Sequence, residues 1–349
     1  MPLNKSRTHL ILGFVISTSA LIWFFLGISW NDLSTVLRRI DPIWVAFSAA
    51  LLLGEFVLRS LRWKILLRPL GLPVKIKDLF VATVVGAAAN TLLPLRAGEI
   101  AKPLIASRRT GHSIPSVIAT AVMERVYDLF GLLCVLLGMV LFLAPNLDQT
   151  ATSSDQLVLI QNLKLYGGIF GVFSLSCMIV FFVLASQKKR SRKIFERILS
   201  IAPKPAQKPF LHLFDGFVAG LENSRDLHGL WQAGLLSIVL WYNGAAAIYC
   251  LFHAFDFLLP FGAACFVAVA IALTVALPQA PGFMGVFHVA MEKTMLLWGE
   301  TSAEAQGFAI VFWAVSFLPV TCVGIIALWN EGLALKELGS TTDAQKNQL

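Results

Sequence analysis

The chain has 349 residues, of which 57% are hydrophobic and only 14% charged, and its formal net charge is +8. About a quarter of the residues of a soluble domain are charged, so this composition, with a mean hydropathy of +0.75, indicates a protein whose solvent is lipid. The positive charge does not indicate nucleic-acid binding, because the basic residues occur in short blocks between apolar runs, the pattern that sets membrane orientation. We therefore expect an all-α, polytopic integral membrane protein.

Six apolar segments approach or exceed the length of about 20 residues that a helix needs to cross a bilayer. They are residues 10–30, 42–58, 115–144, 165–186, 229–252 and 305–329. The first is expected to be a retained helix and not a signal peptide, because its uncharged run is longer than a signal h-region and no small-residue cleavage site follows it.

Two further apolar regions, 79–107 and 257–298, are interrupted near their middle by proline, glycine and polar residues. Residues 59–78 carry six basic side chains and one acidic one, and Arg108 and Arg109 follow the first region, so both of its ends are predicted to be cytoplasmic. It would then be a re-entrant helical hairpin, whose apex must be covered by protein or face a water-filled cavity. The break at residues 277–282 predicts a second hairpin entering from outside, which would make the two halves an inverted repeat.

We expect residues 1–349 to form a single membrane domain. Its first half is 10–186 with hairpin 79–107, a connector follows at 187–228, the second half is 229–330 with hairpin 257–298, and a polar tail covers 331–349. The connector begins basic and continues with apolar residues at helical spacing, so it is either an amphipathic helix in the membrane interface or a core-facing segment. Both termini are predicted to be cytoplasmic, in a bacterial inner membrane.

The densest polar set lies at the first break and consists of Asn90, Pro94, Arg96, Gly98, Glu99 and Lys102. A half-helix beginning near Gly98 would direct its positive end at the break, where Arg96 and Lys102 add two cations. This pattern predicts a site for a phosphate or another anion, in which Glu99 pairs with one of the cations. The alternative is a basic cluster whose side chains extend to the membrane surface.

A second set, Glu124, Arg125 and Asp128, lies inside what should be one continuous helix. Glu124 and Asp128 share a helix face, from which Arg125 is offset by about 100°. Ionisable side chains at membrane depth are costly and are therefore functional candidates. The two acids could balance Arg96 and Lys102 or exchange protons; alternatively, all three charges lie just inside the cytoplasmic headgroups.

Two smaller sets complete the candidates. Glu55 and Arg59 are four residues apart and are predicted to form a salt bridge along one helix, close to Arg62 and Trp63.

The second break contributes Pro281, Gly282, Gly285 and His288. His288 and Glu292 are again four residues apart, but two potential ligands without a third do not predict a metal, so helix packing or proton handling is the expected role. We expect no metal and no cofactor.

At these residues the chain resembles the family of lysylphosphatidylglycerol synthase transmembrane regions, which are flippase-like membrane proteins. The motifs are LPLRAGEIAKP, MERVYD and PQAPGFMGVFHVAM, and the resemblance covers about residues 10–330. It implies movement of a lipid between leaflets, aminoacylated phosphatidylglycerol in bifunctional relatives and hopanoid or polyprenyl lipids in others. The residues that it implicates are Asn90, Pro94, Arg96, Gly98, Glu99, Glu124, Arg125, Asp128, Pro281 and Gly285.

The expected function is therefore transport of a phospholipid or lipid-linked substrate with an anionic headgroup, bound at the first broken hairpin. An alternative is a non-catalytic membrane partner of a lipid- or glycan-modifying enzyme. An intramembrane lipid-modifying enzyme, with Glu124 and Asp128 or His288 and Glu292 as acid–base groups, has less support because no nucleophile–base pair accompanies them. We expect no enzymatic activity, and a lipid-biosynthetic enzyme is an expected partner.

The re-entrant hairpin can be tested by cysteine labelling. In a background without native cysteines, Leu70→Cys and Thr110→Cys should both react with a membrane-impermeant thiol reagent from the cytoplasmic face only, because both ends of residues 79–107 would lie on that face. Labelling of the two positions from opposite faces would exclude the hairpin.

Overall fold

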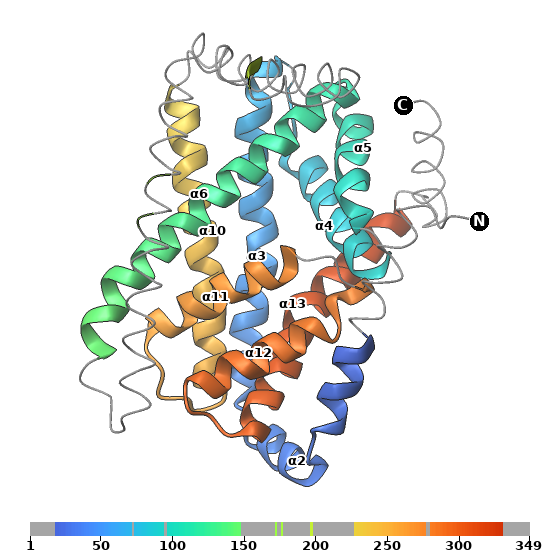
Figure 1. The fold of residues 1–349 in the computed structure, drawn as a ribbon. Helices are drawn as coiled ribbons and strands as arrows, with labels where there is room; N and C mark the ends of the chain where they lie inside the picture. Colours follow the sequence, from blue (N-terminus) through green and yellow to red (C-terminus); the bar gives the residue numbers. More distant parts are fainter. Residues whose placement is uncertain are drawn as a thin grey trace. The chain divides into compact units, whose positions relative to one another are not determined.

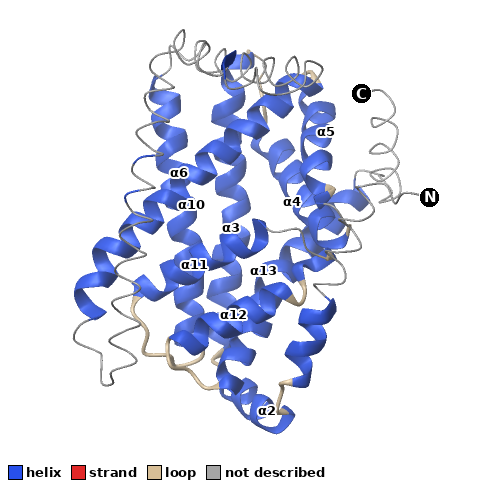
Figure 2. Ribbon diagram, in the orientation of Figure 1, coloured by secondary structure: helices blue, strands red, loops and turns tan. Residues whose placement is uncertain are grey.

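The computed structural model describes residues 18–71, 73–93, 96–147, 172, 176, 196–197, 227–276 and 280–330. Within these ranges all regular structure is helical and no strand occurs (Figure 2), so the all-α fold class is confirmed for this part of the chain. Apart from a few residues, the predicted span 165–186 and the connector 187–228 lie outside the described residues, as does the whole tail 331–349.

The helices follow one another along the chain as labelled in Figure 1. They are Thr18–Leu26, α2 (Trp30–Arg39), α3 (Pro42–Leu67), η1 (Arg68–Leu70), α4 (Ile76–Leu92), α5 (Gly98–Thr110), α6 (Ile114–Leu147), α10 (Leu227–Ala254), α11 (Phe261–Ala276), η3 (Pro281–Phe283), α12 (Val286–Leu297) and α13 (Ser302–Asn330).

Among the described residues, three helices are long and apolar enough to cross a membrane: α3, α10 and α13. They correspond to the predicted spans 42–58, 229–252 and 305–329. The first predicted span, 10–30, differs from the expectation, because its helix ends at Leu26 and the chain bends by 89° into α2. Helix α6, which covers the segment 115–144, has 34 residues. Six full spans therefore remain a prediction.

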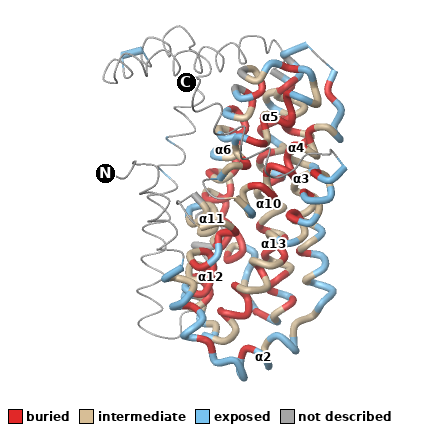
Figure 3. The backbone as a smooth tube through the Cα atoms, turned by 90° about the vertical axis from the view of Figure 1, so that its right-hand side faces the viewer, coloured by how far each residue is buried: buried red, intermediate tan, exposed pale blue. Residues whose placement is uncertain are grey.

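Large apolar side chains are exposed on the long helices. Figure 3 shows exposed backbone positions on these helices beside buried ones. On α3, Ile43 is 63% and Phe47 is 56% exposed; on α10, Trp231 is 74% and Leu235 is 63% exposed. Exposed large apolar side chains on long apolar helices are what lipid chains contact in a membrane protein. The exposure pattern supports the membrane class indicated by the composition.

The chain divides into two compact units, each of which draws on both predicted halves of the sequence. Unit 1 comprises Met1–Arg59, Lys77–Ile105 and Tyr242–Leu349, and unit 2 comprises Ser60–Ile76 and Ala106–Trp241.

Unit 1 contains both interrupted regions, and each is a pair of antiparallel helices. In the first pair, Gly86 of α4 faces Gly98 and Lys102 of α5. In the second pair, the rings of Phe266 near the start of α11 and Trp298 just after α12 lie 6.0 Å apart. Both regions are thus helical hairpins, and their re-entry into a membrane remains a prediction.

Helix α13 packs against the hairpins and supplies much of the core of unit 1. A Cβ atom on Gly324 would lie 2.6 Å from the carbonyl oxygen of Val84 on α4, so only glycine allows this approach. Nearer its start, Phe308 is fully buried among the rings of Phe252, Phe255 and Phe257.

Unit 2 is built from α6 packed against the first part of α10. A Cβ atom on Gly131 would overlap the Trp241 indole and lie 2.7 Å from the carbonyl oxygen of Ser237. Met123, Tyr127 and Ala233 form the buried apolar cluster between the same two helices. The end of α3 joins this cluster and carries the arginine described below.

The close approach of α4 and α5 predicts that Gly98→Ala destabilises the protein. The added methyl group would overlap the Gly86 carbonyl oxygen, and overpacking of this kind costs about 1–3 kcal/mol. Gly54→Ala, inside α3, is the matched control because nothing lies within 4 Å of its Cβ position. Thermal unfolding in detergent should show a lower midpoint for G98A and an unchanged or higher one for G54A. Equal midpoints for the two variants would contradict the predicted contact.

Candidate functional site

The first break lies between the end of α4 at Leu92 and the start of α5 at Gly98. Arg96 has a φ of 55°, a left-handed conformation that non-glycine residues adopt rarely and that marks a constrained turn. Pro94, which the sequence predicts as a cause of the break, lies outside the described residues.

The side chains at this break are held by close backbone packing. A Cβ atom on Gly98 would overlap the Gly86 carbonyl oxygen and lie 2.6 Å from Oδ1 of Asn90. That Asn90 oxygen is buried and accepts no hydrogen bond from the described residues. On the next turn of α5, the Cβ atom of Lys102 would lie 2.8 Å from a Cβ atom at Gly86. Asn90, Gly98 and Lys102 therefore lie at one contact between α4 and α5.

Arg96 and Glu99 form the predicted ion pair, but a loose one. Their charged atoms lie 4.0 Å apart and their side chains are 43% and 35% exposed. Exposed pairs of this kind contribute about 0–1 kcal/mol, so an incoming anion could replace Glu99 as the partner of Arg96 at little cost. The start of α5 adds its positive helix end to the same place.

The second break, between α11 and α12, has three residues with constrained backbone within four positions. Gly282, Phe283 and Gly285 all have positive φ, at 74°, 57° and 86°. The carbonyl oxygen of Gly282 accepts a hydrogen bond of 2.7 Å from the indole Nε1 of Trp313 on α13. This side chain satisfies a carbonyl that the interrupted helix leaves free.

The two breaks meet inside unit 1. A Cβ atom on Gly282 would lie 3.7 Å from the carbonyl oxygen of Thr91, in the last turn of α4. Pro281 begins the η3 turn in the second break, and Gly285 precedes the first residue of α12. Of the predicted residues, Asn90, Arg96, Gly98, Pro281 and Gly282 thus lie at or beside two adjoining breaks.

His288 lies in the core of unit 1, and its role in a substrate site stays a prediction. It is 95% buried in α12, with ring contacts to Phe24, Phe287 and Trp313. One helical turn on, Glu292 is equally buried and accepts a hydrogen bond from Gln306. Gln306 was missed by the sequence reasoning because an amide near the start of an apolar helix carries no charge to mark it.

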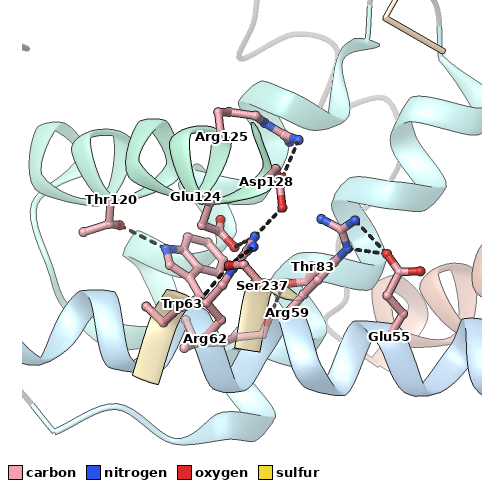
Figure 4. A network of polar contacts seen from close by, with 12 residues as sticks. Glu55, Arg59, Arg62, Trp63, Thr83, Thr120, Glu124, Arg125, Asp128 and Ser237 are labelled. Atoms are coloured by element: carbon pink, nitrogen blue, oxygen red, sulfur yellow. Dashed lines mark hydrogen bonds and ion pairs between the residues drawn. The ribbon is translucent and has the colours of Figure 1, made fainter. Parts of the chain in front are cut away.

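The second polar set forms a network in unit 2, and its centre is Arg62 (Figure 4). The guanidinium of Arg62 is fully buried and donates hydrogen bonds to Asp128 at 2.7 Å and to the Ser237 hydroxyl at 2.9 Å. Glu124 lies 3.9 Å from the same guanidinium. Beside it, the Trp63 indole donates to the Thr120 hydroxyl.

The network answers the question of what Glu124 and Asp128 balance. The described contacts pair both acids with Arg62, and Asp128 with Arg125 at 3.3 Å, so Arg62 takes the role that the sequence hypothesis gave to Arg96 and Lys102. Arg125 is exposed, in agreement with its predicted offset from that face. The signal in the sequence is an arginine within a helix that has no acid three or four residues away, because such a charge needs a partner from another helix.

The pair Glu55–Arg59 is confirmed, with two hydrogen bonds of 2.7 and 2.9 Å on α3. Within the described residues no group of three histidine, cysteine, aspartate or glutamate side chains could hold a metal ion. The arrangement can therefore bind an anion at Arg96 and hold a fixed ion network at Arg62.

The chain is similar in sequence to a known family of membrane proteins and to several of its relatives. The family model described as the lysylphosphatidylglycerol synthase TM region matches residues 10–324. Two UPF0104 membrane proteins of Methanothermobacter thermautotrophicus are 26% identical over 86% of this chain and 87% of theirs, and 23% identical over 96% and 98%. The glycosyltransferase AglD of Haloferax volcanii is 30% identical over 128 residues, which is 37% of this chain and 20% of that protein.

Arg62 should be far more important for stability than Arg59, although the two lie one turn apart on the same helix. Arg62→Ala removes the cation 3.9 Å from the buried Glu124 and the hydrogen bond to Asp128, and breaking a buried ion pair costs about 3–5 kcal/mol. Arg59→Ala removes a part-exposed pair along one helix and should cost about 0.3–0.5 kcal/mol. Denaturation of the two purified variants in detergent measures the difference, and a loss in R62A as small as that expected for R59A would show that the network does not stabilise the fold.

Proposed function

Because this chain belongs to the family of lysylphosphatidylglycerol synthase transmembrane regions, we propose that it moves a membrane lipid with an anionic headgroup between the two leaflets. The headgroup binds at the first break, and the acyl or polyprenyl chains stay in the bilayer. The protein functions as a non-enzymatic transporter in the inner membrane, with both termini in the cytoplasm.

The observation that carries this proposal is the meeting of two broken helical hairpins at Thr91 and Gly282. Transporters of several folds place substrate where interrupted helices from two repeats meet, because the breaks supply polar backbone groups at membrane depth. Interrupted backbone at that depth is tolerated only where protein or a water-filled cavity surrounds it. Two adjoining breaks in one compact unit fit a substrate passage better than two isolated packing defects.

The chemistry at the first break supports an anionic headgroup. Arg96 is 43% exposed and only loosely paired, and it lies two residues before the positive end of a 13-residue helix. A guanidinium binds phosphate through two parallel hydrogen bonds, and each hydrogen bond to a charged group contributes about 1.5–3 kcal/mol. Lys102, on the next turn of the same helix, adds a second cation for a phosphate or phosphodiester.

A second candidate function is that of a membrane partner for a lipid- or glycan-modifying enzyme. One observation favours it: the relative with 128 matching residues is a glycosyltransferase, and the match covers 20% of its length. A segment of this kind could present a lipid-linked substrate to a catalytic domain without changing the lipid itself.

Translocation of labelled lipids in proteoliposomes tests the proposal. Arg96→Ala should slow movement of a phosphate-bearing lipid about 10- to 100-fold, which corresponds to the loss of one charge-assisted hydrogen bond. Arg96→Lys should restore part of the rate, and Arg108→Ala, at an exposed position of the same helix, should leave it unchanged.

The lipid panel and the products distinguish the alternatives. Anionic phospholipids, aminoacylated lipids and polyprenyl phosphates are compared in the same assay, together with analysis of each lipid for chemical change. Equal rates for R96A and the unsubstituted protein would exclude this headgroup site. Binding of a biosynthetic enzyme without any translocation would favour the partner function, and chemical change of the lipid would indicate an enzyme.

A further inference from the structure

A buried polar cluster in unit 1 joins α12, α13 and the bend near the start of the chain. His288 and Glu292 lie four residues apart on α12, and Gln306 lies in the second turn of α13. Their exposed fractions are 5%, 6% and 3%. Burial of three polar side chains is costly unless their polar atoms are hydrogen-bonded, so the bonding of this cluster decides its character.

Gln306 is the link between the cluster and the bend. Its Nε2 donates one hydrogen bond of 3.1 Å to Oε1 of Glu292 and another of 3.2 Å to the carbonyl oxygen of Gly27. Gly27 follows the helix Thr18–Leu26 at the point where the chain turns by 89° into α2. The carboxyl group of Glu292 and the backbone of the bend therefore share one amide group.

Two polar atoms in this cluster have no hydrogen-bond partner. Among the described residues, Oε2 of Glu292 and Nδ1 of His288 are both buried and both without a hydrogen-bond partner. The His288 ring lies among aromatic rings, with centroids 5.1 Å from Phe24 and 5.8 Å from Trp313. A buried unpartnered polar atom costs about 1–3 kcal/mol, so this arrangement is not that of a satisfied core histidine and glutamate.

No cation balances a charge on Glu292 among the described contacts of this region. Lys293, the next residue, is exposed and its ammonium group lies 4.7 Å from the centroid of the Trp23 ring. Glu304 on α13 is bonded to the Thr301 backbone and hydroxyl. The remaining titratable side chains on the packed helices α2, α10, α11 and α13 are Asp32, Arg38, Arg39, His228, Tyr242, Tyr249, Cys250, His253, Cys265 and Cys322.

We propose that Glu292 and His288 form a buried proton-binding site, and that loss of the proton from Glu292 alters the hydrogen bonds by which Gln306 holds the bend at Gly27. A protonated carboxyl group is neutral, which removes the cost of a buried unpaired charge. The protonated carboxyl group of Glu292 also has an O–H group that can donate a hydrogen bond. The Nδ1 atom of an uncharged His288 ring, one helical turn away, can accept one. The proton comes from and returns to water, so no other reactant is needed.

The consequence for transport rests on the function proposed above. A neutral Glu292 leaves Gln306 free to bond the Gly27 carbonyl, whereas an ionised Glu292 attracts both amide protons of Gln306 and competes for that bond. Proton binding would therefore bias the bend between the helix Thr18–Leu26 and α2, and with it the packing of α13 that supports both breaks. A proton gradient could then drive lipid movement.

Infrared spectroscopy of the purified protein tests the proton site without any transport assay. At mildly alkaline pH the carbonyl stretching band of a protonated carboxyl group should be present in the unsubstituted protein and lost in Glu292→Gln. Glu300→Gln is the matched control: burial, followed by the nearby Glu304, raises the pKa of Glu300 to about 7, so this carboxyl is already ionised there. His288→Phe, which keeps an aromatic ring but removes the acceptor, should shift the loss of the band to lower pH.

A band unchanged by E292Q would overturn the proposal, provided that size-exclusion chromatography shows the variant to be folded. Glu292→Asp, which keeps a carboxyl group, should retain a band and provides a second check.

Translocation in proteoliposomes with an imposed pH gradient tests the coupling. The gradient should accelerate lipid movement in the unsubstituted protein and in E300Q and have no effect in E292Q. Acceleration of E292Q by the gradient would exclude coupling through this site. If no variant moves lipid but the band still depends on Glu292, the proton site stands and the transport function fails.

Discussion

Interrupting a membrane helix frees backbone N–H and C=O groups that lipid cannot bind, and this constraint organises unit 1. At the second break, the carbonyl oxygen of Gly282 accepts a hydrogen bond from the indole of Trp313 on α13, which satisfies a backbone group that the interruption frees. The same helix packs through Gly324 against Val84 of α4, the helix that ends at the first break. One uninterrupted helix therefore supports both interrupted hairpins, and the breaks can persist because their surroundings are fixed.

The two helices of the first hairpin, α4 and α5, also approach each other closely through their backbones. Gly86 and Gly98 let α4 and α5 come together so tightly that no side chain fits between them. In lipid, association of helices depends on van der Waals packing, because lipid tails are as apolar as the side chains. The glycines thus stabilise the hairpin, and they place Arg96 and Glu99 at its turn.

The two sets of charges serve different purposes. Arg62 is fully buried and bonded to Asp128 and Ser237, which makes it a fixed structural centre of unit 2. Arg96 is half-exposed and its ion pair with Glu99 is long, so it remains available to an anion. The two arginines thus differ in burial and in the distance to their acidic partners, and not in residue type.

The sequence by itself determined the membrane class, the two helix breaks and the local pair Glu55–Arg59, because composition, proline and glycine positions and i, i+4 spacing act within a few residues. Only the tertiary structure decided that Asp128 pairs with Arg62, 66 residues away, and that Gln306 reaches Gly27 across 279 residues. It also decided that the breaks adjoin each other. Such contacts depend on how helices pack, and helical periodicity shows which face of a helix is buried but not which helix will cover it.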